Sequence, residues 1–192
     1  MLNDVGLTIT SKTNGFAAVV PYSHARGLQT IVDRLGQLCA VVYRIPAYQI
    51  RIDGGDTYTA VRFGLQNTGA WPAPATRKCD AGLFHAHTCR PTWNPGYSPH
   101  SFRGMGTPGA WVLLLGRGFL IHEGPDRARN GVGGSLGCVE ILDGKWDAFL
   151  KQVQKLGNGS CAAIGRAGKL EVTIEAGSYP TGTLIGALPM MK

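Results

Sequence analysis

The chain of 192 residues lacks several features that would assign it to a class at once. Its five cysteines form no CxxC pair, so we expect no zinc site and no other metal. No run of Lys and Arg resembles a nucleic-acid-binding arm, and we expect no nucleic-acid partner. The apolar stretch AWVLLL is far shorter than the ~18 residues of a membrane helix, so we expect no membrane insertion.

The N-terminus, MLNDVGLTIT, also lacks a basic segment followed by an apolar one. A secretory signal needs both, so the sequence predicts a protein made without a Sec signal. Such a protein is secreted or delivered to the periplasm of a target cell by another route, or it stays cytoplasmic. No internal repeat and no low-complexity linker is present, and the length predicts one domain over residues 1–192.

Glycine and basic residues are plentiful. The 28 glycines and 11 prolines indicate short strands and many turns, so the predicted class is mostly β with a few helices (α+β). The formal charge of +7 favours an anionic partner such as a cell-wall polymer, although solubility alone would also explain it.

Hydrophobic periodicity predicts individual elements. Alternation in YQIRID, in TYTAVRFGL and over residues 170–176 indicates strands, and AWVLLLGRGFLIHEG indicates a hairpin. Helical spacing predicts a helix over 23–39 and another after Asp143, capped by that residue and ended by Gly157. Residues 71–107 are expected to be irregular.

The cysteine count is odd, so at least one thiol is unpaired. Two disulfide bridges are conceivable, Cys79 with Cys89 and Cys39 with Cys161. They would leave Cys138 as the one thiol outside a disulfide. Reduced, buried cysteines are the alternative.

The segment GVGGSLGCVEI raises the central question of the sequence. Cys138 follows a glycine-rich turn, and His122 precedes it by sixteen residues. A histidine can take the proton of a thiol, and glycine-rich backbone can present N–H groups to an oxyanion. Cys138 is therefore either a nucleophile with His122 as its base or a buried thiol at a turn.

At these residues the chain resembles the L,D-transpeptidase (YkuD-type) catalytic domain. IHEG and SLGCVEI are similar to the histidine–x–glycine and serine–x–glycine–cysteine segments of that family, over about residues 100–176. The resemblance implies a compact, β-sandwich-like domain. It also implies a cysteine that forms a thioester with the diaminopimelate residue of a peptidoglycan stem peptide and passes the acyl group to an amine or to water.

The resemblance also implies roles for single residues. Cys138 matches the nucleophile and His122 the base, and the backbone carbonyl of Glu123 would orient that base. Gly137 and Cys138 would supply oxyanion-hole N–H groups. Gly124 and Ser135 match motif positions that contribute to the substrate site. No cofactor is implied.

Two positions depart from the family pattern. Leu136 stands where many members have a second histidine, and Glu140 where many have arginine or asparagine. Both positions shape the substrate groove in the family, so the departures predict a divergent branch. Some divergent relatives are antibacterial effectors of the type VI secretion system, for which an immunity protein and the secretion apparatus would be partners. The alternative is a non-catalytic module that binds cell wall or a partner.

Other candidates come from the residues themselves. Arg127 and Arg129 lie between base and nucleophile and would hold a substrate carboxylate, unless that loop is simply solvated. His85, His87 and Cys89 alternate as metal ligands would, but without a fourth ligand nearby. A papain-like hydrolase is disfavoured, because its cysteine precedes its histidine.

Overall fold

The computed structural model describes residues 1–23, 27–28, 30–62, 65–66, 77–78, 84–99, 106–113, 118–129, 131–133, 137–178 and 182–189. These residues form a mostly β structure with two α-helices, which confirms the predicted class. The first elements are β1 (Val5–Val19), β2 (Tyr22–Ser23), β3 (Gly27–Leu28), β4 (Thr30–Val32), β5 (Leu38–Ile52), β6 (Thr57–Val61), β7 (Leu65–Gln66), β8 (Arg77–Lys78), β9 (His87–Cys89) and β10 (Thr92–Asn94). The others are β11 (Ala110–Leu113), β12 (Phe119–Glu123), the 3₁₀-helix η2 (Arg127–Arg129), β13 (Val132–Gly133), β14 (Val139–Ile141), α1 (Trp146–Gly157), α2 (Cys161–Arg166), β15 (Leu170–Ile174) and β16 (Thr183–Pro189).

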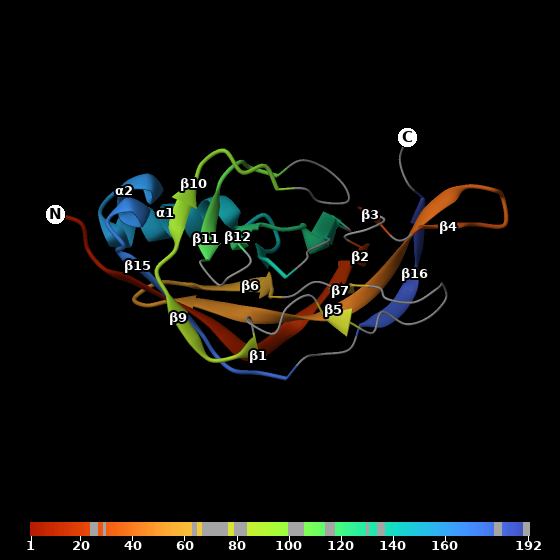
Figure 1. Ribbon diagram of the computed structural model, residues 1–192, viewed down its shortest axis with the longest axis horizontal. Helices are drawn as coiled ribbons and strands as arrows, with labels where there is room; N and C mark the ends of the chain where they lie inside the picture. The colour runs from red at the N-terminus through yellow and green to blue at the C-terminus, as the bar shows by residue number, and fades with distance from the viewer. Residues whose placement is uncertain are drawn as a thin grey trace.

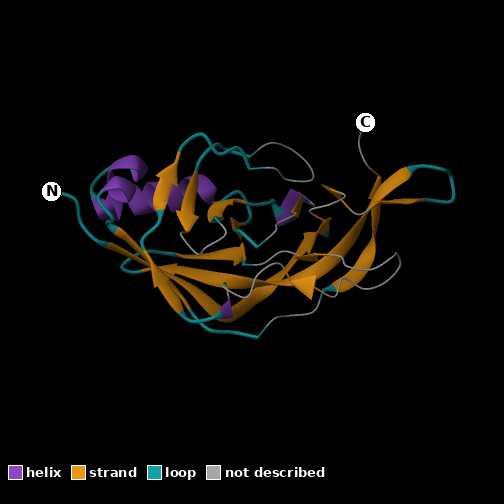
Figure 2. Ribbon diagram, viewed as in Figure 1, coloured by secondary structure: helices purple, strands orange, loops and turns teal. Residues whose placement is uncertain are grey.

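Most strands belong to one sheet with the order β10-β11-β12-β14-β6-β5-β1-β15-β9. The long strands β1 and β5 lie near its centre and pair antiparallel. Figure 1 shows α1, α2 and β10–β12 gathered at one end of these strands, while β4 and β16 extend the other end. The helices therefore cover only part of the sheet, as Figure 2 shows.

The centre of the sheet comes from the N-terminal third of the chain rather than from the motif-bearing segment. β14 pairs with β6, and β15 pairs with β1, so residues before 70 join the strands on either side. The main core correspondingly includes Leu7 and Ile45 together with Val139 and Val172. The strands that carry His122 and Cys138 thus depend on β5 and β6 for their position.

The first half of β5 is buried and apolar on both faces of the sheet. Tyr43 and Ile45 belong to the main core, whereas Ala40 and Val42 belong to a second, smaller cluster on the opposite face. Strands covered on both faces show continuous apolar runs rather than alternation. The run CAVVY in β5 is therefore explained by its two-sided burial.

The helix predicted over 23–39 is wrong. The segment contains β3 and β4, and β4 pairs antiparallel with β5, with Ile31 opposite Cys39. Thr30, Ile31 and Val32 are β-branched, which favours strands, and the pairing partner lies only a turn away. The segments LTIT and GFAAV both belong to the single strand β1.

The predicted hairpin is confirmed as β11 and β12, and the predicted strand over 170–176 as β15. In β15 the side chains of Leu170, Val172 and Ile174 are buried and alternate with the exposed Glu171 and the half-buried Thr173. The helix α1 is also confirmed, with Trp146, Phe149 and Val153 buried on its apolar face. Its predicted cap is wrong, because Lys145 occupies the N-cap position and makes no side-chain cap hydrogen bond. Part of the region expected to be irregular forms the strands β9 and β10.

Candidate active site

His122 and Cys138 come from neighbouring parallel strands. β12 pairs with β14 in the register Ile121–Val139, His122–Glu140. Paired residues point to the same face of a sheet, and so do residues two apart on one strand. His122 and Glu140 therefore share one face, and Cys138, immediately before β14, continues it. Ile121 and Val139 point to the opposite face, where both are fully buried in the core.

This register makes Cys138 a diagonal neighbour of His122. Diagonal Cα positions across neighbouring strands lie about 7–8 Å apart, within reach of a histidine side chain. The Cys138 side chain is half-buried, whereas His122 and Glu140 are buried.

The imidazole of His122 is fixed by the backbone. Its Nδ1 lies 2.7 Å from the carbonyl oxygen of Glu123, and the side chain is 4 % exposed. Because a carbonyl only accepts hydrogen bonds, Nδ1 carries the proton in the neutral ring. The other nitrogen, Nε2, is then the one that can accept a proton from a thiol.

Tyr97 packs on this imidazole. The two ring centroids lie 5.1 Å apart at an angle of 44°. Burial raises the pKa of the Tyr97 hydroxyl well above its usual value, and the charges of Cys138 and Glu140 raise it further. Tyr97 is therefore a neutral phenol beside Cys138 and Glu140. Sequence reasoning missed it, since a tyrosine in a proline-rich loop carries no pattern that points to a site.

Gly137 fits only as glycine. Its φ is +126°, a conformation that other residues rarely adopt, and a Cβ there would lie 2.5 Å from a ring carbon of Phe119. The glycine thus lets the chain turn tightly into Cys138, with Phe119 packed behind it. Ser135 and Leu136, the other predicted residues of this turn, lie outside the described residues.

Glu140 is a buried acid in this site. It is 2 % exposed, and burial raises the pKa of its carboxyl to about 8. Its Oε2 has no hydrogen-bond partner among the residues that the structure describes. Gly124, predicted as a motif position, passes directly over it: a Cβ on Gly124 would lie 2.6 Å from the Cβ of Glu140.

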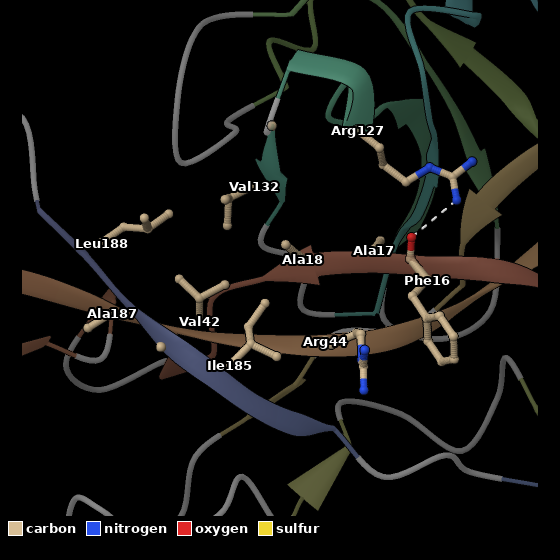
Figure 3. Close-up of a pocket in the computed structure, with 12 residues that line it drawn as sticks. Phe16, Ala17, Ala18, Val42, Arg44, Arg127, Val132, Ile185, Ala187 and Leu188 are labelled. Atoms are coloured by element: carbon tan, nitrogen blue, oxygen red, sulfur yellow. Dashed lines mark hydrogen bonds between the residues drawn. The ribbon is translucent and has the colours of Figure 1, made fainter.

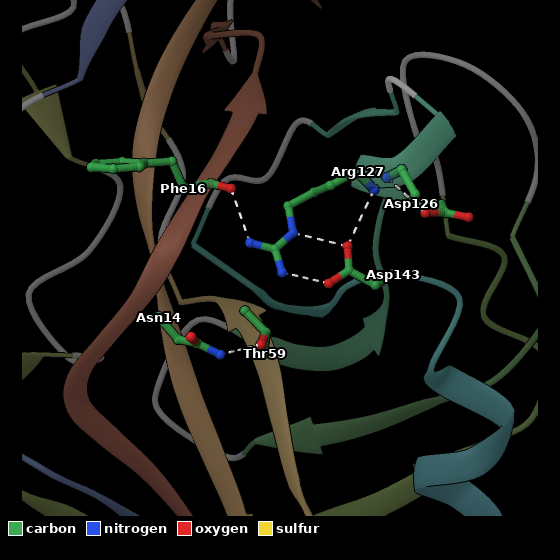
Figure 4. Close-up of polar contacts among 7 residues, drawn as sticks. Asn14, Phe16, Thr59, Asp126, Arg127 and Asp143 are labelled. Carbon is green, nitrogen blue, oxygen red and sulfur yellow. Dashed lines mark hydrogen bonds and ion pairs between the residues drawn. The ribbon is translucent and has the colours of Figure 1, made fainter.

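Arg127 is engaged within the protein, as Figure 4 shows. Its Nε donates to Asp143 Oδ1 at 2.8 Å, Nη2 bonds the second carboxylate oxygen, and Nη1 donates to the carbonyl of Phe16 at 3.1 Å. These hydrogen bonds lower the pKa of Asp143 and raise that of Arg127. The guanidinium face predicted for a substrate carboxylate is thus occupied by Asp143, which also explains why Asp143 does not cap α1.

Arg129 lies in the same segment with its side chain 87 % exposed, and its Nε is 3.4 Å from Asp126. Its guanidinium is open to solvent, so the predicted contact with a substrate carboxylate is sterically possible. That role stays a prediction.

A groove of about 560 Å³ lies on the outer face of β1 and β5. Figure 3 shows Arg127 and Val132 on one side of it and Ile185, Ala187 and Leu188 of β16 on the other. The described residues that line it do not include His122 or Cys138. The segment between base and nucleophile nevertheless forms part of its wall, through Arg127, Gly131 and Val132.

The other described cysteines are thiols. Cys39, Cys89 and Cys161 are unbridged, so the two disulfides considered from the cysteine count are not formed; Cys79 lies outside the described residues. Within the described ranges, no group of three or more His, Cys, Asp or Glu side chains is arranged to hold a metal ion. No helix in that part of the chain is long and apolar enough to span a bilayer.

Comparison with known proteins gives no relative: no family model, no curated protein and no solved structure matches the chain.

Proposed function

We propose that this chain is a cysteine-dependent acyl-transfer enzyme that acts on peptidoglycan stem peptides. The observation that supports the proposal best is the register of β12 against β14, which pairs His122 with Glu140, two residues after Cys138. The contact of Nδ1 with the Glu123 carbonyl adds to it, since it leaves Nε2 as the proton acceptor. The resemblance of IHEG and SLGCVEI to L,D-transpeptidase motifs supplies the substrate class.

In the proposed reaction, Nε2 of His122 takes the proton of the Cys138 thiol. The thiolate attacks a carbonyl carbon of the stem peptide, and the backbone N–H groups of Gly137 and Cys138 stabilise the oxyanion. The imidazolium then gives its proton to the leaving amine, and a thioester remains. An amine or water attacks the thioester, with His122 as base, so the outcome is transpeptidation, amino-acid exchange or carboxypeptidase trimming. The side chains and backbone supply each proton transfer, and we propose no cofactor.

The net charge of +7 agrees with an anionic cell-wall substrate. We extend the proposal to delivery: the protein acts in the periplasm of a target cell as an antibacterial effector, with an immunity protein and a secretion apparatus as partners. This part rests on the resemblance alone. Expression of the chain with a periplasmic signal in a Gram-negative host tests it. Arrested growth that requires Cys138 is expected, and normal growth would refute delivery as an effector.

The enzyme proposal is tested with purified muropeptides and mass spectrometry of the products. Wild type is expected to change the stem peptides, and Cys138→Ala to leave them unchanged. Cys89→Ala is the matched control, because Cys89 is also a half-buried thiol and lies in β9, away from His122. Equal product formation by wild type and Cys138→Ala would overturn the proposal.

A binding module is the second candidate, favoured by the groove on β1, β5 and β16. That groove is apolar over Ala18, Val42 and Leu188, and Arg44 lies at its wall with its guanidinium over the ring of Phe16. Retained muropeptide binding with no product from any variant would support this candidate.

A further inference from the structure

Glu140 lies beneath the segment that joins the base to the nucleophile. We call residues 124–129 and 131–133, the described part of that segment, the connecting segment. A Cβ on Gly133 would lie 2.6 Å from Oε2 of Glu140, and a Cβ on Gly124 would lie 2.6 Å from its Cβ. Pro125 packs against Gly133 at the same place. Two glycines therefore let the connecting segment close over the carboxyl and exclude water from it.

The described groups that face Glu140 offer its charge little support. From β12 comes His122, from the start of β14 Cys138, and from the loop after β10 Tyr97. From β6 comes Val61, which pairs with Glu140 and is apolar. The neighbouring Arg62 donates instead to the carbonyls of Thr10 and Glu175.

The ion pair that joins Arg127 of the connecting segment to Asp143 is held in its charged form near neutral pH. Asp143 has its pKa lowered and Arg127 has its pKa raised by their mutual hydrogen bonds. The Arg127–Asp143 ion pair, which joins the connecting segment to the turn before α1, is thus unchanged near neutral pH. The Oε2 atom of Glu140, in contrast, is buried with no hydrogen-bond donor among the described residues, which disfavours the carboxylate relative to its protonated form.

We propose that Glu140 is a positioning residue: as a neutral acid it allows the connecting segment to close, and its ionisation favours opening of that segment, which ends at the Cys138 turn. In the open state water reaches the carboxylate, so ionisation and opening are linked. The part of this inference that concerns catalysis rests on the proposed function, whereas the linkage itself does not.

The linkage has a definite size and direction. Between the ordinary pKa of 4.5 and the raised value of about 8, the closed state binds a proton that the open state has lost. The opening equilibrium is therefore expected to rise roughly a few hundredfold between pH 5 and pH 8. Glu140→Gln removes the titrating group with little change of shape, so its opening should be nearly independent of pH.

Hydrogen exchange of the Gly124 and Gly131 amides measures this opening. In the closed segment these amides donate to the carbonyls of Ile141 and Asp126, each at 2.8 Å. After correction for intrinsic exchange rates, protection is expected to fall with rising pH in wild type and to stay level in Glu140→Gln. Amides of α1 serve as the internal reference, and His122→Gln should keep the wild-type pH dependence. Parallel behaviour of wild type and Glu140→Gln would overturn the inference.

A second measurement does not depend on any variant. The carboxyl carbon of Glu140, followed by NMR in the wild-type protein, should titrate near pH 8, where the loss of protection levels off. Titration in the ordinary range of glutamate would also overturn the inference. Labelling of Cys138 by iodoacetamide in the same samples, faster than Cys89 and slowed by His122→Ala, tests the proposed dyad separately. Equal labelling of both cysteines would remove the proposed function and leave the linkage standing.

Discussion

The guanidinium of Arg127 donates two hydrogen bonds to the carboxylate of Asp143 and thereby joins the connecting segment to the turn before α1. Asp143 has a positive φ of 64°, and its backbone N–H donates to the carbonyl of Pro125 at 3.1 Å. The same turn is thus tied to the connecting segment through both backbone and side chain. Cys138 lies between these two segments along the chain.

Removing this ion pair is expected to destabilise the protein. The two side chains are 28 % and 30 % exposed, so we expect a coupling of about 1–2 kcal/mol in a double-mutant cycle of Arg127→Ala and Asp143→Ala. The pKa of Asp143 is lowered in the folded state, so this stability is present above its unfolded value of about 3.8 and is lost as the pH falls through the lowered value. Urea unfolding of the four proteins at neutral and acidic pH measures both effects.

The neighbouring pair of Arg129 and Asp126 is the control for that cycle. Arg129 is 87 % exposed, and its contact with Asp126 is 3.4 Å long, so its coupling should stay within about 0.5 kcal/mol. Equal coupling free energies in the two pairs would show that the geometry of the Arg127–Asp143 pair adds nothing to stability beyond an exposed ion pair.

The sequence predicted elements whose pattern arises locally. The hairpin of β11 and β12 has a glycine turn between two apolar runs, and α1 has an apolar face at helical spacing. The neighbouring positions of β12, which carries His122, and β14, which follows Cys138, were also approachable, because one connecting loop joins the two strands. In each case the residues that determine the structure are close along the chain.

Features set by distant pairing were not predictable in this way. β4 is a different case, because Ile31 and Leu38 have helical spacing but lie on strands that pair across one short turn. Tyr97 reaches His122 from a proline-rich loop distant along the chain, and Asp143 binds Arg127 rather than the helix end. The burial of Glu140 requires Gly124 and Gly133 to approach it, which only the tertiary structure reveals.

Gly137→Ala is expected to destabilise the turn before the nucleophile. The substitution combines a positive φ with a contact of 2.5 Å between the new Cβ and Phe119, so we expect a loss of about 2–4 kcal/mol. Gly118→Ala separates the two causes, since Gly118 has a φ of +70° and nothing within 4 Å of its Cβ position. It should cost only about 1 kcal/mol. Thermal and urea unfolding give these values, and similar losses in the two variants would argue against the contact with Phe119.

Tyr97 is expected to act on His122 through its ring and not through its hydroxyl. Tyr97→Phe keeps the ring 5.1 Å from the imidazole and should leave the His122-dependent labelling of Cys138 within about twofold of wild type. Tyr97→Ala removes the packing, so the labelling rate should fall toward that of His122→Ala. Nitrogen NMR of His122 reports the ring directly, and loss of a single Nδ1–H tautomer is expected only in the alanine variant. A phenylalanine variant as slow as the alanine variant would instead assign the role to the hydroxyl.

Glu140→Gln is expected to stabilise the protein at alkaline pH and not at acidic pH. The folded state raises the pKa of this carboxyl from 4.5 to about 8, so between these values the folded protein binds the proton more tightly than the unfolded chain. Stability contributed by this group therefore falls as the pH rises through that window and is constant above it. The difference in unfolding free energy between Glu140→Gln and wild type should grow by on the order of 4 kcal/mol from pH 4 to pH 9. Urea unfolding across that range measures it, with Glu171→Gln as the control because Glu171 is exposed on β15. A difference that stays constant with pH would mean that Glu140 ionises as freely in the folded protein as in the unfolded chain.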